Sequence, residues 1–360
     1  MLHPSESRVP FFAALCLFLS AIEYAIPKPL PFMRLGLANL PVLISFATMS
    51  KRDTVLLITL KVFGQALISG TLFSYIFVFS SAGSFASGFA MLACYTLFHK
   101  TNHISHIGVS LAGALANNAA QIAVARLMIF GENTRYIAPI LFAVGLITAL
   151  ILGIFANVFC AKSTWYHNLL INNFEGKAFL SLQPGSLRGQ ENDVSLPAQL
   201  IVAMVLLPLF LLHQHIISFV LHSANDVVRV CIAWTLVAIF FIMAAVKKRG
   251  KIKLLPSLFI TLGITFFALF VPSGKILFSI GAFKITLDAL LTGLRKSAIL
   301  VGMVFLSQFA IDGHVRLPGK AGAFLCEMFA VFDALTSERL HFKKGRIIEM
   351  LDERLTALQN

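Results

Sequence analysis

The first 130 residues of the chain combine long apolar runs with polar side chains suited to binding a ligand. The candidate binding residues are Arg34, Asn39, Lys61, Gln65, Asn118, Gln121 and Arg126. An ionisable or amide group inside a membrane-spanning helix costs a few kcal/mol, so a group kept there indicates a functional site. Cations attract an anionic ligand, and amides both donate and accept hydrogen bonds. The alternative is that these groups only hold helices together, as amides often do.

One predicted helix carries polar groups on two neighbouring faces. Gln121 follows Asn117 by four residues, so these two side chains share a face. Asn118 and Arg126 are eight residues apart and lie on the face beside it. We therefore expect Asn118 and Gln121 to line a ligand cavity, with Arg126 as a further binding residue.

Lys61 and Gln65 repeat the four-residue spacing in another predicted helix. Lys61 is about 12–15 Å of helix rise beyond Lys51 and Arg52, which places it near the middle of a membrane. An unpaired cation is expensive at that depth, so both Lys61 and Gln65 are candidates for ligand contact. Glu23 closes the first apolar run and is a candidate counter-charge.

The stretch "IPKPLPFMRLGLANLPVLI" (residues 26–44) separates the first two apolar runs. Its first three prolines, Pro27, Pro29 and Pro31, cannot continue a helix, and irregular backbone at membrane depth needs protein or a wet cavity around it. We expect this stretch to form the outer wall of a ligand cavity, with Arg34 and Asn39 in contact with the ligand. The alternative is a plain outer loop whose cations reach the lipid headgroups.

The composition indicates the environment of these residues. The chain has 360 residues, of which 58% are hydrophobic and 12% charged, whereas soluble domains carry about 25% charged residues. The chain is therefore of the membrane class. Its net charge of +13 would suit nucleic acid, but the cations lie between apolar runs and act as topology signals. We expect a lipid bilayer, and no nucleic acid, as its surroundings.

Ten apolar runs reach or approach the roughly 20 residues that a spanning helix needs. They are residues 9–26, 37–50, 54–71, 73–98, 104–130, 136–161, 198–220, 227–246, 255–272 and 288–311. The second run is short and indicates a broken or tilted helix. The sequence therefore predicts an all-α fold, a polytopic membrane bundle of about ten helices in two modules, followed by a cytoplasmic helical tail.

Basic residues predict the orientation of these helices. Lys51 and Arg52, then Lys100, then the cations from Lys162 onward, and then the cluster at 247–253 fall on alternate connections. Positive loops stay in the cytoplasm, so we expect a multi-pass protein of the cell inner membrane with both termini cytoplasmic. The polar residues 162–197 then form a cytoplasmic linker. It joins a six-span module (1–161) to a four-span module (198–311), and residues 312–360 form an amphipathic tail.

Three segments resemble signatures of a known family. "PFMRLGLANLPVLI", "GTLFSYIFVFSSAGSFASGFAM" and "IGVSLAGALANNAAQIAVA" are similar, in order and spacing, to the Gx transporter family. That family is also named heptaprenyl diphosphate synthase component I, and it resembles the substrate-capture (S) components of energy-coupling factor transporters. The resemblance covers residues 9–161 and implies a ligand site in this module. Asn117 stands where the family has His, and Lys61 where Arg is usual, so the ligand itself is left open.

The second half resembles a different protein class. "GKILFSIGAFKITLDALLTGLRKSAILVGMVFLSQF" is similar to a segment of the transmembrane (T) component of energy-coupling factor transporters. This resemblance covers residues 198–355 and implies coupling to cytoplasmic ABC-type ATPase subunits. The mixed-charge tail (312–360) would then serve as a coupling helix.

Two functions stay open, and neither makes the chain an enzyme. The chain has no GxxxxGK(S/T) phosphate loop, so it is not itself the ATPase. Its aspartates are dispersed, with no DDxxD pattern for the Mg²⁺ of a prenyl synthase. We expect no catalytic residue, metal or cofactor. The first hypothesis is a transport protein for a small molecule, with anionic, vitamin-like, isoprenoid-related or flavin-related compounds as candidates. The second is a non-catalytic accessory subunit of a heptaprenyl diphosphate synthase in a quinone pathway.

Overall fold

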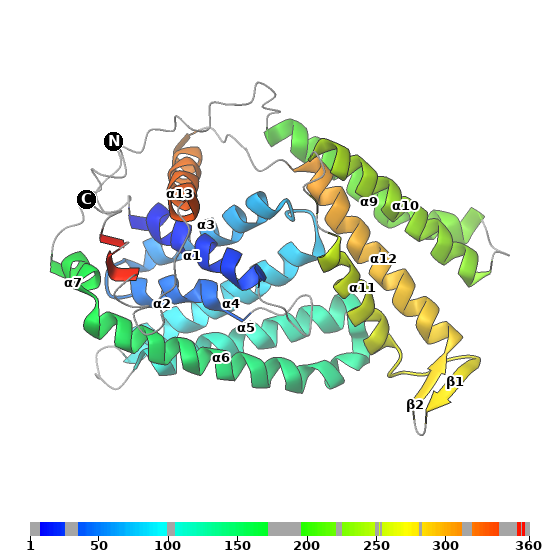
Figure 1. Cartoon of the computed structure of the whole chain (residues 1–360), viewed down its shortest axis with the longest axis horizontal. Coiled ribbons are helices and arrows are strands. Elements are labelled where there is room, and N and C mark those ends of the chain that lie inside the picture. The colour runs from blue at the N-terminus through cyan, green and yellow to red at the C-terminus, as the bar shows by residue number, and fades with distance from the viewer. Residues whose placement is uncertain are drawn as a thin grey trace.

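The structure is an elongated bundle of helices (Figure 1). It is a computed structural model that describes residues 8–25, 35–98, 105–171, 196–220, 225–248, 252, 254–280, 283–311, 319–337, 351–353 and 355–356. We call its described residues from 8 to 171 the first module and those from 196 to 311 the second module; α7 (Thr164–Ile171) thus joins the first module, although the sequence predicted a linker from residue 162. Within the described residues the chain forms helices and a single two-stranded sheet. The predicted class, an all-α helical membrane fold, is therefore confirmed.

The first module contains the apolar runs predicted between residues 9 and 161. Its helices are α1 (Arg8–Ala25), η1 (Leu37–Asn39), α2 (Leu40–Ser45), α3 (Lys51–Ser69), α4 (Tyr75–Phe98), α5 (His106–Ala125), a π turn η3 (Arg126–Phe130), η4 (Gly131–Asn133), α6 (Thr134–Lys162) and α7 (Thr164–Ile171). The second predicted run is a 3-10 turn followed by the 6-residue α2. Such a helix is about 9 Å long, whereas the hydrocarbon core is about 30 Å thick. This segment therefore lies within the module rather than crossing the membrane by itself.

The second module contains α9 (Leu196–Val220), α10 (Asp226–Lys247), α11 (Leu255–Ala268) and α12 (Leu287–Ala310). Between α11 and α12 the chain forms an antiparallel hairpin of β1 (Ile276–Ile280) and β2 (Phe283–Thr286), in which Ser279 pairs with Lys284. The hairpin projects from the end of the module (Figure 1). The sequence did not predict it, because two strands of five and four residues lie below the length at which an apolar pattern stands out from a loop.

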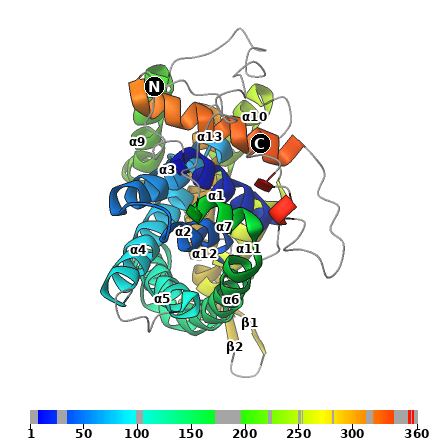
Figure 2. The ribbon, with the colours of Figure 1, turned by 90° about the vertical axis from the view of Figure 1, so that its left-hand side faces the viewer.

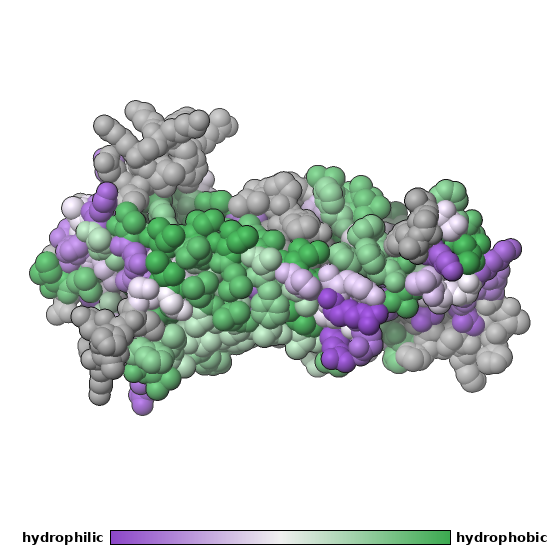
Figure 3. Space-filling view, turned by 90° about the horizontal axis from the view of Figure 1, so that it is seen from below, coloured by the Kyte–Doolittle hydropathy of each residue, from purple (hydrophilic) through white to green (hydrophobic). Residues whose placement is uncertain are grey.

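Several helices are long and apolar enough to cross a membrane. Among the described residues these are Tyr75–Phe98, the continuous stretch His106–Lys162 that includes α5 and α6, Asp226–Lys247, and Leu287–Ala310. Two shorter apolar helices are Ile201–Leu212 and Leu255–Ala268. Large apolar side chains cover much of the face seen in Figure 3. On α6 they include Ile147, Leu150, Ile151 and Ile154, all more than 40% exposed. These features indicate a multi-pass membrane protein, and the count of ten spans stays a prediction.

The two modules share one hydrophobic core. Tyr75, Phe130 and Ile137 of the first module pack in the same cluster as Ile264 and Phe305 of the second. Polar contacts cross the same boundary: the Phe73 backbone N–H donates to Ser307 Oγ at 3.0 Å, and Lys296 Nζ donates to the Ile129 carbonyl at 2.8 Å. The second module therefore has a fixed position against α4 and the end of α5.

The C-terminal tail returns to the first module. Helix α13 (Gly319–Ser337) lies across α1 (Figure 2), and its buried Leu325, Met328 and Val331 belong to the same core cluster as α1. Farther on, the Asp352 carboxylate caps α7. It accepts from the backbone N–H groups of Thr164 at 3.1 Å and Trp165 at 3.0 Å, and from the side-chain hydroxyls of Ser163 and Thr164. An anion is favoured at a helix N-terminus, so Asp352 attaches the tail to the module.

We expect Asp352→Asn to loosen the tail and to remove an acid-dependent transition. Burial of the Asp352 carboxylate acts to raise its pKa, but the hydrogen bonds from Ser163, Thr164 and Trp165 outweigh burial and leave the pKa below its usual value. A lowered folded-state pKa stabilises the attachment above about pH 4, and this contribution is lost as pH falls through the lowered pKa. Hydrogen–deuterium exchange of residues 351–356, corrected for intrinsic rates, should be faster in Asp352→Asn at pH 7. It should be unchanged in the control Glu353→Gln, whose side chain is exposed. Equal exchange in both variants would contradict the attachment.

Candidate functional site

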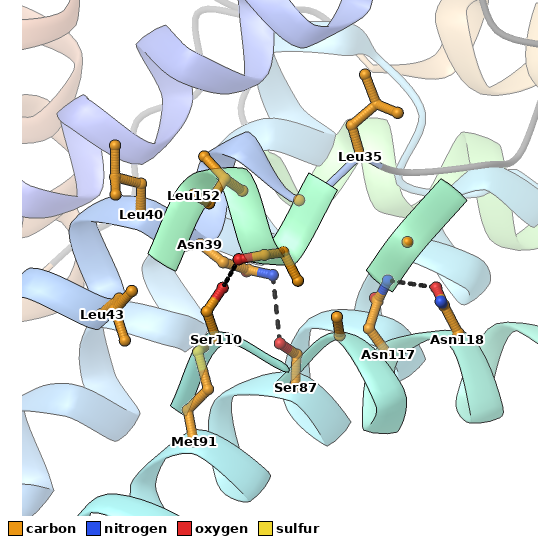
Figure 4. A pocket seen from close by; sticks show the side chains of 14 residues that line it. Leu35, Asn39, Leu40, Leu43, Ser87, Met91, Ser110, Asn117, Asn118 and Leu152 are labelled. Carbon is orange, nitrogen blue, oxygen red and sulfur yellow. Dashed lines mark hydrogen bonds between the residues drawn. The ribbon is translucent and has the colours of Figure 1, made fainter. Parts of the chain in front are cut away.

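A small polar cavity lies between the short helices η1 and α2 and the long helices α4, α5 and α6 (Figure 4). Its volume is about 20 Å³, which admits about one water molecule. The residues that line this polar cavity are Leu35, Gly36, Asn39, Leu40, Leu43, Ser87, Met91, Ser110, Ala114, Asn117, Asn118, Gly145, Ala149 and Leu152. Amide and hydroxyl groups thus face apolar side chains inside the membrane-spanning part of the molecule.

Asn39 is positioned by a carboxylate from the first helix. Glu23 is 2% exposed, and its two oxygens accept from the backbone N–H groups of Leu35 at 2.8 Å, Gly36 at 3.2 Å and Leu37 at 3.0 Å. These N–H groups precede or begin η1, where a helix leaves its donors without internal partners. Gly36 has φ of 89°, which favours glycine. Glu23 therefore fixes the turn that aims Asn39 at the cavity.

A buried lysine reaches the cavity wall through Asn39. Lys61 is 4% exposed, and its Nζ donates to Asn39 Oδ1. The Asn39 Nδ2 group then donates to Ser87 Oγ at 3.2 Å, as Figure 4 shows. Asn39 thus connects a cation on α3 with a hydroxyl on α4. A ligand with a negatively charged or acceptor group would compete for the same donors.

The amides of α5 form a second part of the site. Asn118 Nδ2 donates to the Leu141 carbonyl of α6 at 3.0 Å, and Gln121 Nε2 donates to Asn117 Oδ1 at 3.1 Å. Asn117 and Asn118 are also within 3.5 Å of each other. The buried Gln121 Oε1 has no hydrogen-bond partner among the described residues. A buried acceptor without a partner is costly, so this amide group has an acceptor available for a donor that enters the cluster.

The structure brings together only some of the predicted binding residues. Asn39 and Asn118 line the polar cavity, and Gln121 and Lys61 each contact one of its lining residues. Gln65 instead donates to Ser20 Oγ. The structure therefore places Gln65 in a contact between α3 and α1.

Arg126 does not line the polar cavity. Arg126 lies where α5 gives way to the π turn, and its Nη2 pairs with Glu132 Oε1 at 2.6 Å. Both side chains are exposed, at 63% and 81%, so the structure places Arg126 on the surface. Arg34 and residues 26–33, including the three prolines, lie outside the described residues.

Sequence reasoning missed several residues that line or shape the polar cavity. Ser87 and Ser110 were not proposed as site residues, although both line it, and Ser110 Oγ donates to the Ala149 carbonyl at 2.8 Å. Gly83 and Gly145 give the amides room: a Cβ at Gly83 would lie 2.3 Å from Asn117 Oδ1, and one at Gly145 would lie 2.1 Å from Asn118 Nδ2. The available signal was the four-residue spacing of Gly83 and Ser87, which reads as ordinary helix packing.

The arrangement can bind a small ligand by hydrogen bonds. It combines amide donors and acceptors, hydroxyls and the Lys61 ammonium, and no group of three metal-ligating side chains occurs in the part of the chain that the structure describes. Polar groups that converge in an otherwise apolar site fix the orientation of a small ligand. Apolar helices around such a cluster define a multi-pass helical membrane protein.

Two segments of the chain match known protein families. Residues 12–159 match a family described as heptaprenyl diphosphate synthase component I. Residues 216–313 match a second family, described as a domain of unknown function, DUF8519. The likeness of the second half to an energy-coupling factor component is therefore not shown. No curated protein and no solved structure matches the chain.

Proposed function

We propose that the chain is a membrane transport protein whose first module captures a small molecule in the polar cavity. The observation that carries the proposal is the convergence of Asn39, Ser87 and Asn118 on one cavity, with the buried Lys61 ammonium bonded to Asn39. A cation and several amides are expensive to keep among membrane-spanning helices. Binding of an anionic or hydrogen-bonding ligand explains why these groups are kept there, whereas helix packing alone does not require them.

Capture requires that the cavity open. Its volume of about 20 Å³ is too small for any organic ligand. The part of the wall best suited to move is η1 with α2, because these helices are only 3 and 6 residues long. The chain forms a turn directly after α2. Short helices have few internal hydrogen bonds. Outward movement of this segment would admit the ligand between α4, α5 and α6.

We further propose that the second module couples this capture to cytoplasmic ABC-type ATPase subunits, with both termini of the chain in the cytoplasm. The resemblance of the second half to a T component supports this role. The contacts of Ser307 and Lys296 with the first module, and the packing of α13 on α1, give the second half two separate attachments to the capture module. Movement of a partner subunit bound to the tail would therefore reach α1.

The second candidate function is that of a non-catalytic accessory subunit of a prenyl diphosphate synthase. The description of the matching family, heptaprenyl diphosphate synthase component I, favours it. Purification of the tagged chain under mild conditions separates the two functions. Coupling predicts stoichiometric copurification of a subunit that carries a GxxxxGK(S/T) loop, whereas the accessory role predicts a soluble subunit with a DDxxD motif. Recovery of the latter alone would overturn the transport proposal.

Binding of the small molecule that copurifies with the chain should weaken in Asn39→Ala and in Asn118→Ala. Native mass spectrometry of the purified protein first identifies that molecule, and calorimetry then measures its Kd. One lost hydrogen bond contributes about 0.5–1.5 kcal/mol, so each variant should raise the Kd about 2- to 13-fold. Asn157→Ala is the matched control, because Asn157 Oδ1 lies 2.8 Å from His106 Nδ1 and does not line the polar cavity. Unchanged binding in both cavity variants would place the ligand elsewhere.

A further inference from the structure

A second, larger cavity adjoins the polar one. Its volume is about 320 Å³, and all of the side chains that line it are apolar or aromatic. It lies between α1, the η1–α2 segment, α6, the start of α7 and the C-terminal tail, and we call it the apolar cavity. Leu40 and Leu152 line both cavities and so separate them. For comparison, a dry cavity of about 150 Å³ lined by aliphatic side chains and Phe is large enough to bind benzene.

The tail closes one side of the apolar cavity. Leu335 at the end of α13, together with Leu351 and Leu355, forms part of its lining. Asp352 holds Leu351 and Leu355 in place by its hydrogen bonds to the N-terminus of α7. The opposite side reaches the surface at α6, because Ile151 lines the cavity and is also 59% exposed. The cavity therefore has an opening on the apolar outer face of α6.

Trp165 lines this cavity with the apolar part of its ring. Its side chain lines the cavity and is 1% exposed, and it packs between the rings of Phe11, Phe12 and Phe159. No polar atom of the described lining residues faces the cavity, so a hydrocarbon chain matches its surface.

We propose that the apolar cavity holds one acyl chain of a membrane phospholipid. The lining excludes a polar occupant, because its described residues offer no polar partner. Helices that cross a bilayer are surrounded by phospholipid chains at high concentration, and the opening beside Ile151 faces that surrounding. The bound chain contacts α1, α6 and the tail together. This site is separate from ligand capture in the polar cavity.

Quenching of Trp165 fluorescence by brominated lipid tests the proposal. Trp165 and Trp234 are the two tryptophans of the chain, so Trp234→Phe leaves Trp165 as the reporter. The variant is reconstituted in vesicles of dioleoylphosphatidylcholine and in vesicles of the same lipid with dibrominated chains. Bromine quenches indole on contact, and bulk lipid does not contact a side chain that is 1% exposed. We expect a large loss of emission in the brominated vesicles.

Two matched double variants show whether the loss comes from the cavity. Leu19→Phe with Ile151→Phe fills the cavity, since both residues line it. Ile147→Phe with Leu150→Phe makes the same two exchanges at exposed positions of α6 that do not line it. Quenching should disappear in the filled protein and persist in the control. No loss of emission in the unfilled protein, or an equal loss in both doubles, would overturn the proposal.

A measurement without substitutions keeps the proposal testable if the filled variant does not fold. Native mass spectrometry of the full chain, after extensive washing in detergent, should retain one phospholipid per chain. Retention of a hydrocarbon compound without a phosphate headgroup, or of detergent alone, would assign the cavity to a different occupant and overturn the phospholipid assignment.

Discussion

Replacement of Glu23 by alanine should lower the free energy of unfolding by about 3 kcal/mol or more. The carboxylate accepts from three backbone N–H groups, those of Leu35, Gly36 and Leu37, and it is 2% exposed. Hydrogen bonds to a charged group contribute about 1.5–3 kcal/mol each, and removal of the acceptor leaves the buried donors without partners. The turn before η1 should open, and Asn39 should lose its position at the cavity.

Denaturant titration of the purified protein in detergent micelles measures this loss. Glu132→Ala is the control, because Glu132 is 81% exposed and pairs with Arg126 on the surface, where an ion pair contributes about 0–1 kcal/mol. Glu23→Gln should fall between the two, since its amide retains one acceptor oxygen but places an NH₂ group against the N–H donors. Unfolding of Glu23→Ala at the same denaturant concentration as Glu132→Ala would show that Glu23 does not support η1.

The course of the long helices was predictable from the sequence because each needs only a continuous apolar run. The run predicted at 136–161 is helix α6 (Thr134–Lys162), and the run at 288–311 is α12 (Leu287–Ala310). Helix ends differ by only one or two residues, which is the usual uncertainty of helix boundaries. The orientation of these helices in the membrane stays a prediction, since it depends on the basic loops and not on helix packing.

Contacts between segments far apart in the chain were not predictable from spacing. Glu23 was predicted to be a candidate counter-charge, and the structure shows that it also accepts three hydrogen bonds from backbone N–H groups of the next segment, which its position in the sequence did not indicate. Arg126 was expected inside a span, but the π turn that follows α5 carries it to the surface beside Glu132. In both cases the outcome depends on where a helix ends. Local sequence patterns determine that point poorly.

The C-terminal tail shows a further limit of prediction from sequence patterns. Its amphipathic pattern predicted a helix with one apolar face, and α13 has such a face. The pattern alone does not say which surface that face contacts, and the sequence was interpreted as a coupling helix, with a tail that simply covers the bundle as the alternative. In the structure, Met328 packs against Gly64 of α3 and the core cluster of α1. The ATPase, if it binds here, therefore contacts the outer face of a helix already docked on the capture module.

Gly145→Ala should destabilise the protein by about 2–4 kcal/mol, although alanine normally favours a helix over glycine. A Cβ at this position would lie 2.1 Å from Asn118 Nδ2 and 2.9 Å from its Cγ. Asn118 is 1% exposed and donates to the Leu141 carbonyl, so it has little room to move without loss of that bond. Overpacking costs about 1–3 kcal/mol, and the lost hydrogen bond adds about 1 kcal/mol. Because Gly145 and Asn118 both line the polar cavity, ligand binding should weaken in the same variant.

The effect of Gly145→Ala on the free energy of unfolding should change sign when Asn118 has already been replaced by alanine. In an Asn118→Ala background the clash is absent, so Gly145→Ala should instead stabilise α6 by up to about 1 kcal/mol, the difference in helix propensity between the two residues. Denaturant titration of the wild type, both single variants and the double variant gives this coupling as a double-mutant cycle. A coupling near zero would mean that α6 shifts to accept the new methyl group and that Gly145 does not set the distance between α5 and α6. A coupling of several kcal/mol would show that the approach of these two helices, set by a glycine, is what holds the Asn118 amide at the cavity.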